Sequence, residues 1–348
     1  MSLKLRIKKT LAPAKWGLIA FLGRHPRLAA LYFALADDSL SREAAGVLAG
    51  RARYRDDTHS PQLSYYLLRR NIHRLEKGLI MRPRRPVFAA DYLPETVDVY
   101  GRSIRHAGEV VTSEHEWAHN VLTEYFSAVD RDHPAIAPEW KKFQRIDAAA
   151  FGVDAPTRIP YTRALADAAP VAFDDFMTLS MRRRSVRWYL DKPVPRELVD
   201  KALDAATQAP SACNRQPFVY RIFDDPAQAR KLAAIPMGTK GFSDQLQAVV
   251  VLVGRLRAYP EARDRHAIYI DASLSAMSFM YALETLGLSS CPINWPDCQP
   301  QEHLIAEAMN LEPDERVIML IAYGWPDPEG MVPYSAKREH SQLRSYNV

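Results

Sequence analysis

The stretch Met181-Arg-Arg-Arg-Ser-Val-Arg187 decides how the second half of the chain is interpreted. In an extended backbone, Arg183, Ser185 and Arg187 point to one side, because side chains alternate along such a segment. Two guanidinium groups flanking a hydroxyl suit a dianionic phosphate at one end and a polar ring edge at the other, since arginine makes bidentate, charge-assisted hydrogen bonds. Taken alone, the run is equally typical of a solvated basic surface or an RNA-binding patch.

A second stretch, Ala209-Pro-Ser-Ala-Cys-Asn-Arg-Gln-Pro-Phe218, follows a predicted helix and leads into a predicted strand. Ser211 and Asn214 are short polar residues on a loop between two prolines. Such a loop can present hydroxyl, amide and backbone groups to the edge of a planar heteroaromatic ring. As an isolated string, it could equally be a simple turn.

Working outward, the first 150 residues are expected to be all-helical. Apolar residues at helical spacing predict a helix over residues 63–80, and two more helices are expected over 94–107 and 113–129. Ser113 and Glu116 have the spacing of a capping box. Prolines and a glycine then interrupt residues 151–172 and mark a boundary.

Beyond that boundary, helical and extended patterns alternate. Helices are expected over residues 174–181, 195–208 and 266–286, and strands over 218–223, 247–253 and 316–323. The strand 247–253 is apolar throughout and should be central. The helix 266–286 is apolar nearly all round, so it needs cover as a core helix or in a subunit interface. We predict a helical domain of unknown role over residues 1–160 and an α+β domain over 161–348, with a small mixed sheet flanked by helices.

Composition excludes several classes of protein. The 348 residues are 47% hydrophobic and 25% charged, which is typical of a globular chain, and no glycine-rich nucleotide-binding motif is present. Three cysteines without metal-ligand spacing indicate reduced thiols in a cytoplasmic protein and no metal site. The net charge of +5 fits an anionic cofactor, and no aromatic-interleaved motif indicates nucleic acid.

The N-terminus combines basic residues with a short apolar stretch, from Trp16 to Leu22. No run of 18 apolar residues predicts a transmembrane helix. Three interpretations remain: a secretion signal, a helix within residues 1–35 that lies on a membrane surface, or a basic helix packed on its own protein. The last is the simplest.

In this order and spacing, the two stretches resemble the nitroreductase family of FMN enzymes. Its first pattern, R-R-S-[VI]-R-x-[FY], is matched by Arg183-Arg-Ser-Val-Arg-Trp-Tyr189, and its second, A-P-S-x-x-N-x-Q-P-[WF], by residues 209–218. Downstream, Leu286-Gly-Leu-Ser-Ser-Cys-Pro-Ile-Asn-Trp295 resembles L-G-L-G-[ST]-C-x-I-G-G, and Ala322-Tyr-Gly-Trp-Pro326 resembles the closing G-[YW]-P. The resemblance covers about half of the chain, and four ordered motifs make it specific.

The resemblance implies FMN as cofactor, NAD(P)H as reductant and a homodimer with two interfacial sites. Arg183 and Arg338, with Lys337, would hold the phosphate; Ser185 and Arg187 would face the ribityl chain and the pyrimidine edge. Backbone N–H groups near Ile293 and Asn294 would approach the flavin N5, and the 209–218 loop would come from the partner subunit. The implied cofactor-binding residues are Arg183, Arg184, Ser185, Arg187, Pro210, Ser211, Ala212, Asn214, Pro292, Ile293, Asn294, Lys337 and Arg338.

One departure from the family pattern concerns the pocket. Asn294-Trp295 stands where the family has Gly-Gly, and glycine lets a backbone approach a ligand closely. Trp295 either points into the core or shapes the pocket over the flavin. The substrate therefore need not be a broad range of nitroaromatics.

Three further features have open alternatives. Cys213 is a redox thiol beside the flavin or a small apolar filler. His266 and Asp271 are a proton donor or an ordinary helix N-terminus. The charged helix over residues 69–79, with His73 and Lys77 on one face, is a lid over the flavin site or a solvated face.

These observations lead to a homodimeric, cytoplasmic FMN oxidoreductase that works by a ping-pong cycle, in which NAD(P)H reduces the flavin and the flavin reduces a second small substrate. An alternative within the fold is a specialised flavin enzyme: flavin-fragmenting, dehalogenating or a dehydrogenase. Another is a membrane-surface or docking protein with a flavin sensor domain.

Overall fold

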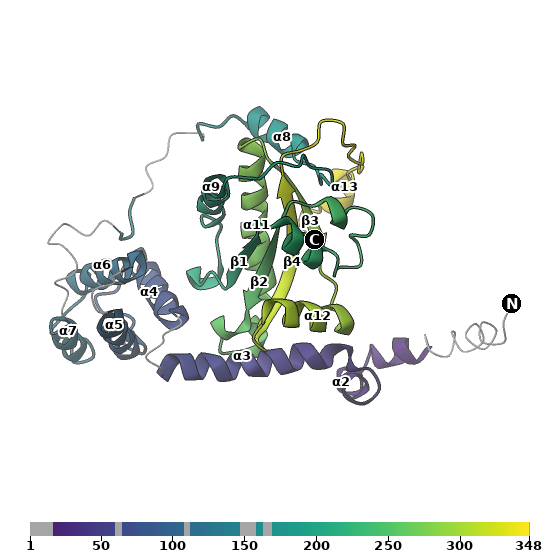
Figure 1. The fold of residues 1–348 in the computed structure, drawn as a ribbon. Coiled ribbons are helices and arrows are strands. Elements are labelled where there is room, and N and C mark those ends of the chain that lie inside the picture. Colours follow the sequence, from purple (N-terminus) through teal and green to yellow (C-terminus); the bar gives the residue numbers. More distant parts are fainter. Residues whose placement is uncertain (1–16, 60–64, 108–111, 147–157, 163–168, 348) are drawn as a thin grey trace.

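The computed structural model describes residues 17–59, 65–107, 112–146, 158–162 and 169–347. It consists of an N-terminal part built of helices and a C-terminal α+β domain built on one sheet (Figure 1). The first part contains α2 Pro26–Leu35, α3 Ser41–His59, α4 Tyr66–Leu79, α5 Leu93–Ala107, α6 Ser113–Ala128 and α7 Ala137–Phe143. The second contains α8 Phe173–Arg182, α9 Arg196–Ala206, α10 Pro226–Ala233, α11 Ala267–Thr285, α12 Gln299–Met309 and the short α13 His340–Leu343.

The sheet has four strands in the order β1-β2-β4-β3. Their bounds are β1 Phe218–Phe223, β2 Ala248–Arg255, β3 Ser289–Asn294 and β4 Glu315–Gly324. Neighbouring strands pair antiparallel, and the parallel pairing is confined to an isolated bridge between Ser185 and Ser290. The expected mixed sheet is therefore antiparallel in its four strands and parallel only where the 183–187 run joins β3.

Two hydrophobic layers cover the two faces of the sheet. Alternating residues of β2 point to opposite faces, so Val250 and Leu252 pack with α9 and α11, whereas Val249 and Val251 pack with α10 and α12. The expectation of a central strand buried on both faces is confirmed, because β2 lies between β1 and β4.

Helix α11 is covered on one side only within the single chain. Ala272, Phe279 and Leu283 are buried, whereas Ile270 and Leu274 are exposed. The sequence predicted either a core helix or a helix buried in a subunit interface, and the buried side of α11 fits the core helix. The subunit interface for its other side stays a prediction.

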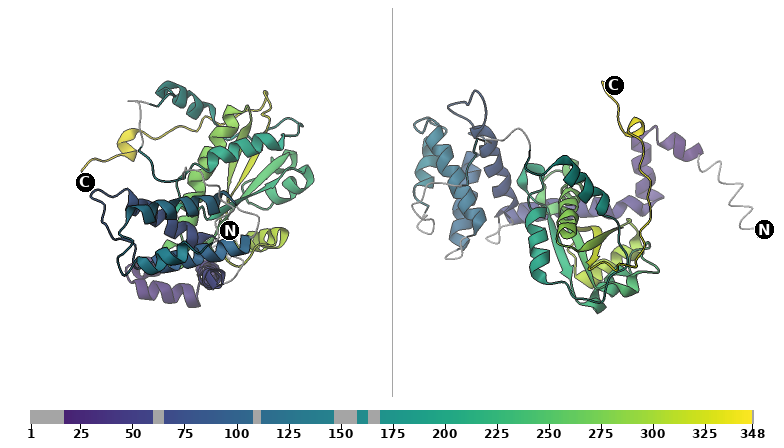
Figure 2. Two further views of the ribbon diagram at one scale, coloured as in Figure 1. Left: turned by 90° about the vertical axis from the view of Figure 1, so that its left-hand side faces the viewer. Right: turned by 90° about the horizontal axis from the view of Figure 1, so that it is seen from above.

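The helices α4 to α7 form a bundle with an apolar core of their own, seen beside the sheet in Figure 1 and in the right-hand view of Figure 2. Leu68, Ile72 and Leu75 of α4 are fully buried against Val121 and Leu122 of α6. The hydrophobic spacing over residues 63–80 thus did specify the buried face of α4.

Helix α3 runs along the base of the C-terminal domain (Figure 1). Two glycines allow this approach: a Cβ at Gly50 would lie 2.7 Å from the Cβ of Leu256, and one at Gly46 would overlap the Arg316 guanidinium. The Arg316 guanidinium donates to the Arg42 carbonyl oxygen at 2.9 Å. The helical part is thus joined to the α+β domain through close backbone packing and charged groups.

The helices and three strands expected from the sequence are present, with ends shifted by a few residues at most. The capping box was wrong by one residue, because Thr112 is the N-cap of α6 and its N–H donates to the His115 ring at 3.1 Å. Strand β3 was not expected as a strand, since Pro292 and Asn294 disfavour that assignment; its edge position tolerates both. Among the described residues, no helix is long and apolar enough to cross a membrane.

Candidate functional site

The 183–187 run begins where α8 ends. Arg183 is the C-cap of α8 with extended dihedral angles, and the backbone leads into the bridge between Ser185 and Ser290. The Val186 N–H donates to the Ser290 carbonyl oxygen at 3.1 Å. The run pairs with β3 at the Ser185 bridge, but the Val186 N–H also donates to the Arg184 carbonyl oxygen at 3.0 Å, so the backbone turns there and is not extended throughout.

One cavity, with a volume of about 300 Å³, lies beside this run and the end of β3. Arg187, Pro292, Ile293 and Asn294, four of the implied cofactor-binding residues, line it together. Its remaining lining residues are Met237, Gly238, Phe242, Cys291 and Pro296. The structure therefore brings together two motifs that are more than a hundred residues apart in the sequence.

The arginines of this site are available for an anion. Among the residues that the structure describes, neither Arg183 nor Arg187 has a carboxylate within ion-pair distance. The Arg187 guanidinium lies 5.7 Å from the centre of the Phe242 ring. Burial raises the pKa of the Cys291 thiol, and the positive charge of Arg187 opposes this rise. The thiol in the cavity is therefore held neutral at physiological pH.

Arg184 has a different position from its neighbours. Its guanidinium donates to the carbonyl oxygens of Pro333 and Tyr334, so it ties the C-terminal segment to the run. Lys337 and Arg338 follow closely on that segment, and both are exposed. The structure thus brings their backbone near the run without recording a contact between their side chains and Arg183.

The 209–218 loop is held by a buried carboxylate. Asp271 of α11, which is 4% exposed, accepts hydrogen bonds from the Ala212 N–H at 3.0 Å and from the Tyr259 hydroxyl at 2.9 Å. Burial raises the pKa of Asp271, and these two hydrogen bonds act against the rise. Asp271 is therefore neither a solvated first-turn acid nor a group open to substrate, but a positioning residue for the loop.

The backbone of this loop is unusual. Cys213, Asn214 and Gln216 have φ angles of 54°, 52° and 49°, in the left-handed region that residues other than glycine and asparagine seldom adopt. The Ser211 hydroxyl accepts from the Gln216 N–H at 3.0 Å and closes the turn. Residues with such strained backbone angles cluster at active sites and ligand-binding loops. The buried carboxylate of Asp271 holds this loop in place.

The two halves of the implied cofactor site do not meet within one chain. Pro210, Ser211, Ala212 and Asn214 are absent from the lining of the cavity that contains Arg187, and the loop instead faces the helical bundle. Arg69 of α4 donates to the Asn214 carbonyl oxygen at 2.7 Å. Arg69 lies at the start of the charged helix over residues 69–79. The residues expected to share a face of that helix, His73 and Lys77, lie further along it.

The position of Trp295 is settled. Its side chain is 8% exposed in the core, and its indole N–H donates to the Glu302 carboxylate at 2.5 Å. Glu302 is also paired with Arg42, which lies at the start of α3. Trp295 points away from the cavity, and its partner connects it to the helical part of the chain.

Fold and site together define an α+β domain with a cavity, lined by Arg187, at its edge strand β3. The model of the Nitroreductase family matches residues 181–245 and 236–325. This C-terminal part of the chain thus matches the nitroreductase family over residues 181–325. The motifs that carried the resemblance lie within or directly beside the matched residues.

Individual relatives are similar at low identity. The NADH dehydrogenase of Thermus thermophilus is 28% identical over 187 residues, which are 45% of this chain and 89% of that protein. The iodotyrosine deiodinase of Danio rerio is 25% identical over 197 residues, which are 48% of this chain and 65% of that protein. The chain thus spans about two thirds of the length of the deiodinases that it matches.

Among solved structures, an FMN-dependent nitroreductase from Clostridium difficile is 22% identical, with a TM-score of 0.43, over 49% of this chain and 99% of that one. A putative nitroreductase from Bacillus subtilis is 22% identical, with a TM-score of 0.44, over 50% and 100%. Both matches cover only half of this chain.

Proposed function

We propose that this protein is a flavin-dependent oxidoreductase that holds FMN at the cavity beside the 183–187 run. The observation that carries the proposal is the convergence of Arg187, Pro292, Ile293 and Asn294 on that cavity. The family match of residues 181–325 supports it, and the name of the Clostridium relative states FMN dependence for that protein.

The residues present fit the cofactor chemically. Arg183 and Arg187 are cations without a carboxylate partner among the described residues, as a phosphate and an electron-rich ring edge require. The buried Ser290 hydroxyl oxygen has no hydrogen-bond partner, which leaves a polar atom for a bound group at the same edge. Arg183, Lys337 and Arg338 would hold the phosphate, and Ser185 and Arg187 the ring edge.

FMN, when bound, supplies hydride transfer. In a ping-pong cycle, NAD(P)H would be oxidised first and a second small substrate reduced afterwards. The Arg187 guanidinium would stabilise negative charge on the reduced ring system, which is the electrostatic contribution that a protein makes to a flavin. The apolar side of the cavity, at Phe242 and Ile293, would limit water.

The complete site would need a second copy of the chain. Within one chain, the 209–218 loop lies away from the Arg187 cavity, so a partner subunit would contribute Pro210, Ser211, Ala212 and Asn214. Supporting this, α8 and α11 expose apolar side chains that a dimer would cover; they are Phe173, Phe176, Met177, Ile270 and Leu274.

The proposal is tested on purified protein by flavin extraction and reconstitution. We expect a yellow protein that binds FMN and is bleached by NADH or NADPH, and we expect Arg187→Ala to bind FMN at least tenfold more weakly. Arg196→Ala, an exposed arginine on α9, is the control. A protein that stays colourless with added FMN would contradict the proposal.

A specialised reaction within the same fold is the second candidate. The relatives include iodotyrosine deiodinases as well as nitroreductases, and Asn294, which lines the cavity, stands where the family pattern has glycine. Stopped-flow reduction by NADH, NADPH and dithionite distinguishes the candidates. Reduction by dithionite alone, followed by reoxidation with a halotyrosine, would favour the dehalogenase.

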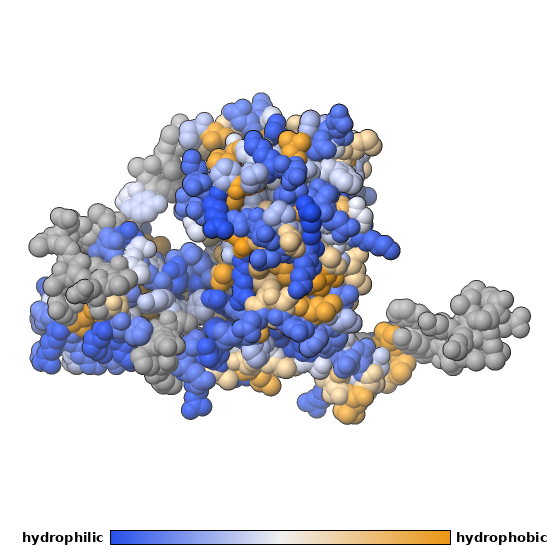
Figure 3. All heavy atoms as spheres, in the orientation of Figure 1, coloured by the Kyte–Doolittle hydropathy of each residue, from blue (hydrophilic) through white to orange (hydrophobic). Residues whose placement is uncertain are grey.

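The membrane-surface or docking role stays a prediction, and residues 1–16 of the 1–35 segment lie outside the described part of the chain. Leu28, Leu31 and Leu35 of α2 are exposed, and Figure 3 shows apolar surface around this helix. Co-sedimentation with anionic liposomes, with and without residues 1–35, tests it. Equal recovery of both forms in the supernatant would remove the idea.

A further inference from the structure

A second cavity lies where the helical part meets the α+β domain. Its volume is about 410 Å³, and α3, α4, α6, the 209–218 loop and the end of β2 all contribute to its wall. Five arginines and two carboxylates line it, together with two tyrosines and a glutamine. The arginines are Arg53, Arg69, Arg215, Arg255 and Arg257, and the acids are Asp57 and Glu114.

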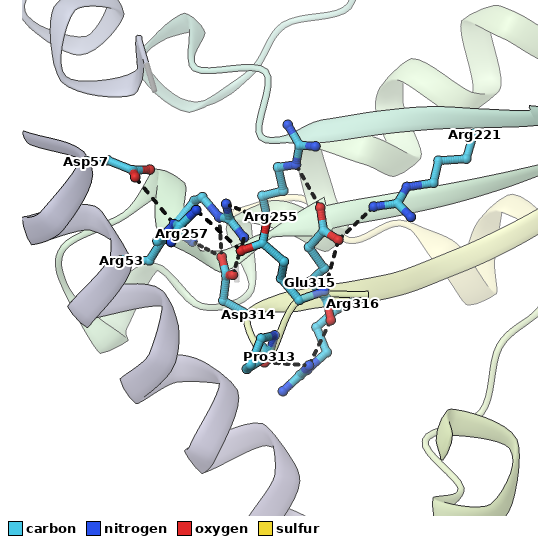
Figure 4. Close-up of polar contacts among 10 residues, drawn as sticks. Arg53, Asp57, Arg221, Arg255, Arg257, Pro313, Asp314, Glu315 and Arg316 are labelled. Carbon is cyan, nitrogen blue, oxygen red and sulfur yellow. Dashed lines mark hydrogen bonds and ion pairs between the residues drawn. The ribbon is translucent and has the colours of Figure 1, made fainter. Parts of the chain in front are cut away.

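Most of these arginines have acidic partners. Figure 4 shows Arg255 beside Glu315 and Arg257 beside Asp314, where the shortest nitrogen–oxygen distances are 3.0 and 2.5 Å. Arg69 pairs with Glu114 at 3.0 Å. These pairs hold the wall of the cavity in place.

Arg215 is the exception. Its side chain is only 6% exposed, and among the described residues no carboxylate lies within ion-pair distance of it. Its Nε has no hydrogen-bond partner, and its guanidinium lies 4.6 Å from the centre of the Tyr259 ring. A buried arginine is expected to have an anionic partner, since an unpaired charge away from water is destabilising.

We propose that this cavity binds a small molecule that carries a phosphate group, with Arg215 as its main contact. The planar fork of Arg215 suits a phosphate oxygen pair, and the guanidinium groups of Arg53 and Arg69, each paired with an acid, line the same cavity. The Tyr65 and Tyr66 rings provide an apolar wall for the organic part of the ligand. The volume is in the range of small-molecule sites.

The cavity is connected to the proposed flavin loop. Arg215 and Gln216 belong to the 209–218 loop and line the cavity, and Arg69 reaches from the same wall to the Asn214 carbonyl oxygen. A ligand on Arg215 therefore tightens the loop that carries Ser211 and Asn214. The consequence of this tightening for FMN binding rests on the proposed function, whereas the binding of the phosphate-bearing ligand to Arg215 does not.

The experiment titrates the FMN-loaded protein with inorganic phosphate, inorganic pyrophosphate and AMP, and follows both calorimetric binding and the melting temperature. We expect saturable binding of at least one probe, roughly tenfold or more weaker in Arg215→Gln. Arg196→Gln, whose side chain is 80% exposed on α9, is the matched control and should bind as the wild type does. In anion-free buffer, Arg215→Gln should melt no lower than the wild type, because it removes an unpaired buried charge.

Two results would overturn the proposal: no saturable binding of any probe by the wild type, or equal affinity in the wild type and Arg215→Gln. The same titration of the FMN-free protein tests the anion site independently of the proposed flavin function. Binding that depends on Arg215 in a protein that takes up no FMN would support the anion site and reject the flavin assignment.

Discussion

The bundle of α4 to α7 and the junction at the base of the sheet are held together by opposite means. The bundle has a continuous apolar core in which Leu75 and Tyr100 are fully buried. At the junction, buried Asp314 and Glu315 pair with arginines of the α+β domain itself (Figure 4), and Arg42 of α3 pairs across to Asp297 and Glu302. Apolar packing makes each part stable, whereas the ion pairs of Arg42 add specific contacts between the parts, because ion pairs demand specific geometry.

The largest effect is expected at the junction. Glu315→Ala leaves Arg221 and Arg255 without the carboxylate that both contact, at 2.7 and 3.0 Å. We expect a loss of about 3–5 kcal/mol in the free energy of unfolding, measured by urea denaturation. Glu312→Ala removes a half-exposed acid from the same segment and should cost at most about 1 kcal/mol. Equal losses would contradict a buried, structural role for Glu315.

The apolar half of the comparison is tested by Leu75→Ala. The substitution leaves a cavity in the bundle and should cost about 2–5 kcal/mol. Because the bundle core is separate from the two sheet cores, hydrogen exchange should accelerate in α4 to α7 and stay slow in β2 and β4. Ile80→Ala, exposed at the end of α4, is the control. Acceleration throughout the sheet would show one cooperative unit instead.

Gly50→Ala tests how closely α3 must approach the α+β domain at Leu256. Alanine favours a helix by roughly 1 kcal/mol over glycine, yet its Cβ would lie 2.8 Å from the Leu256 carbonyl carbon. We expect a net loss of about 1–3 kcal/mol, since backbone atoms cannot move aside easily. Gly17→Ala, with no atom within 4 Å of the added Cβ, should be neutral or stabilising. A stabilised Gly50→Ala would mean that α3 is only loosely joined.

Arg69→Gln removes the link between the bundle and the 209–218 loop. It loses the bonds to Glu114 and to the Asn214 carbonyl oxygen, and about 1 kcal/mol is expected in urea denaturation. Burial raises the pKa of Glu114 and Arg69 lowers it, so the variant should raise that pKa further. Arg74→Gln, on the same helix but away from the loop, should leave both quantities unchanged.

The smallest expected effect is on the rate at which the Cys291 thiol is alkylated, and it does not involve the free energy of unfolding. Burial raises its thiol pKa, so little thiolate exists at pH 7–8 and iodoacetamide should react more slowly than with an ordinary thiol. Arg187→Ala removes a charge that favours the thiolate and should move the reaction to still higher pH. Mass spectrometry of the alkylated peptide, with Cys291→Ser as the blank, measures this. Rapid alkylation at pH 7 would show an activated thiol.

Much of the fold followed from local sequence, and four of the thirteen implied cofactor-binding residues line one cavity. The apolar run at β2 and the helical spacing of α4 predicted which residues are buried. An apolar side chain is stabilised by leaving water, whichever segment covers it. The extended backbone expected at residues 183–187 is found at the bridge between Ser185 and Ser290, and that Arg183, Ser185 and Arg187 share one side stays a prediction. Strand β3 was missed because Pro292 is acceptable only at an edge, and edges are decided by strand order.

The sequence by itself determined the nitroreductase-like domain and its buried strand, and the residues that would face the cofactor stay a prediction. Only the tertiary structure decided that Trp295 turns into the core toward Glu302, that Asp271 holds the 209–218 loop and that Arg215 is buried without an acid. The reason is physical. Burial and periodicity are properties of one segment, whereas the partner of a polar group depends on which distant segment the fold brings to it.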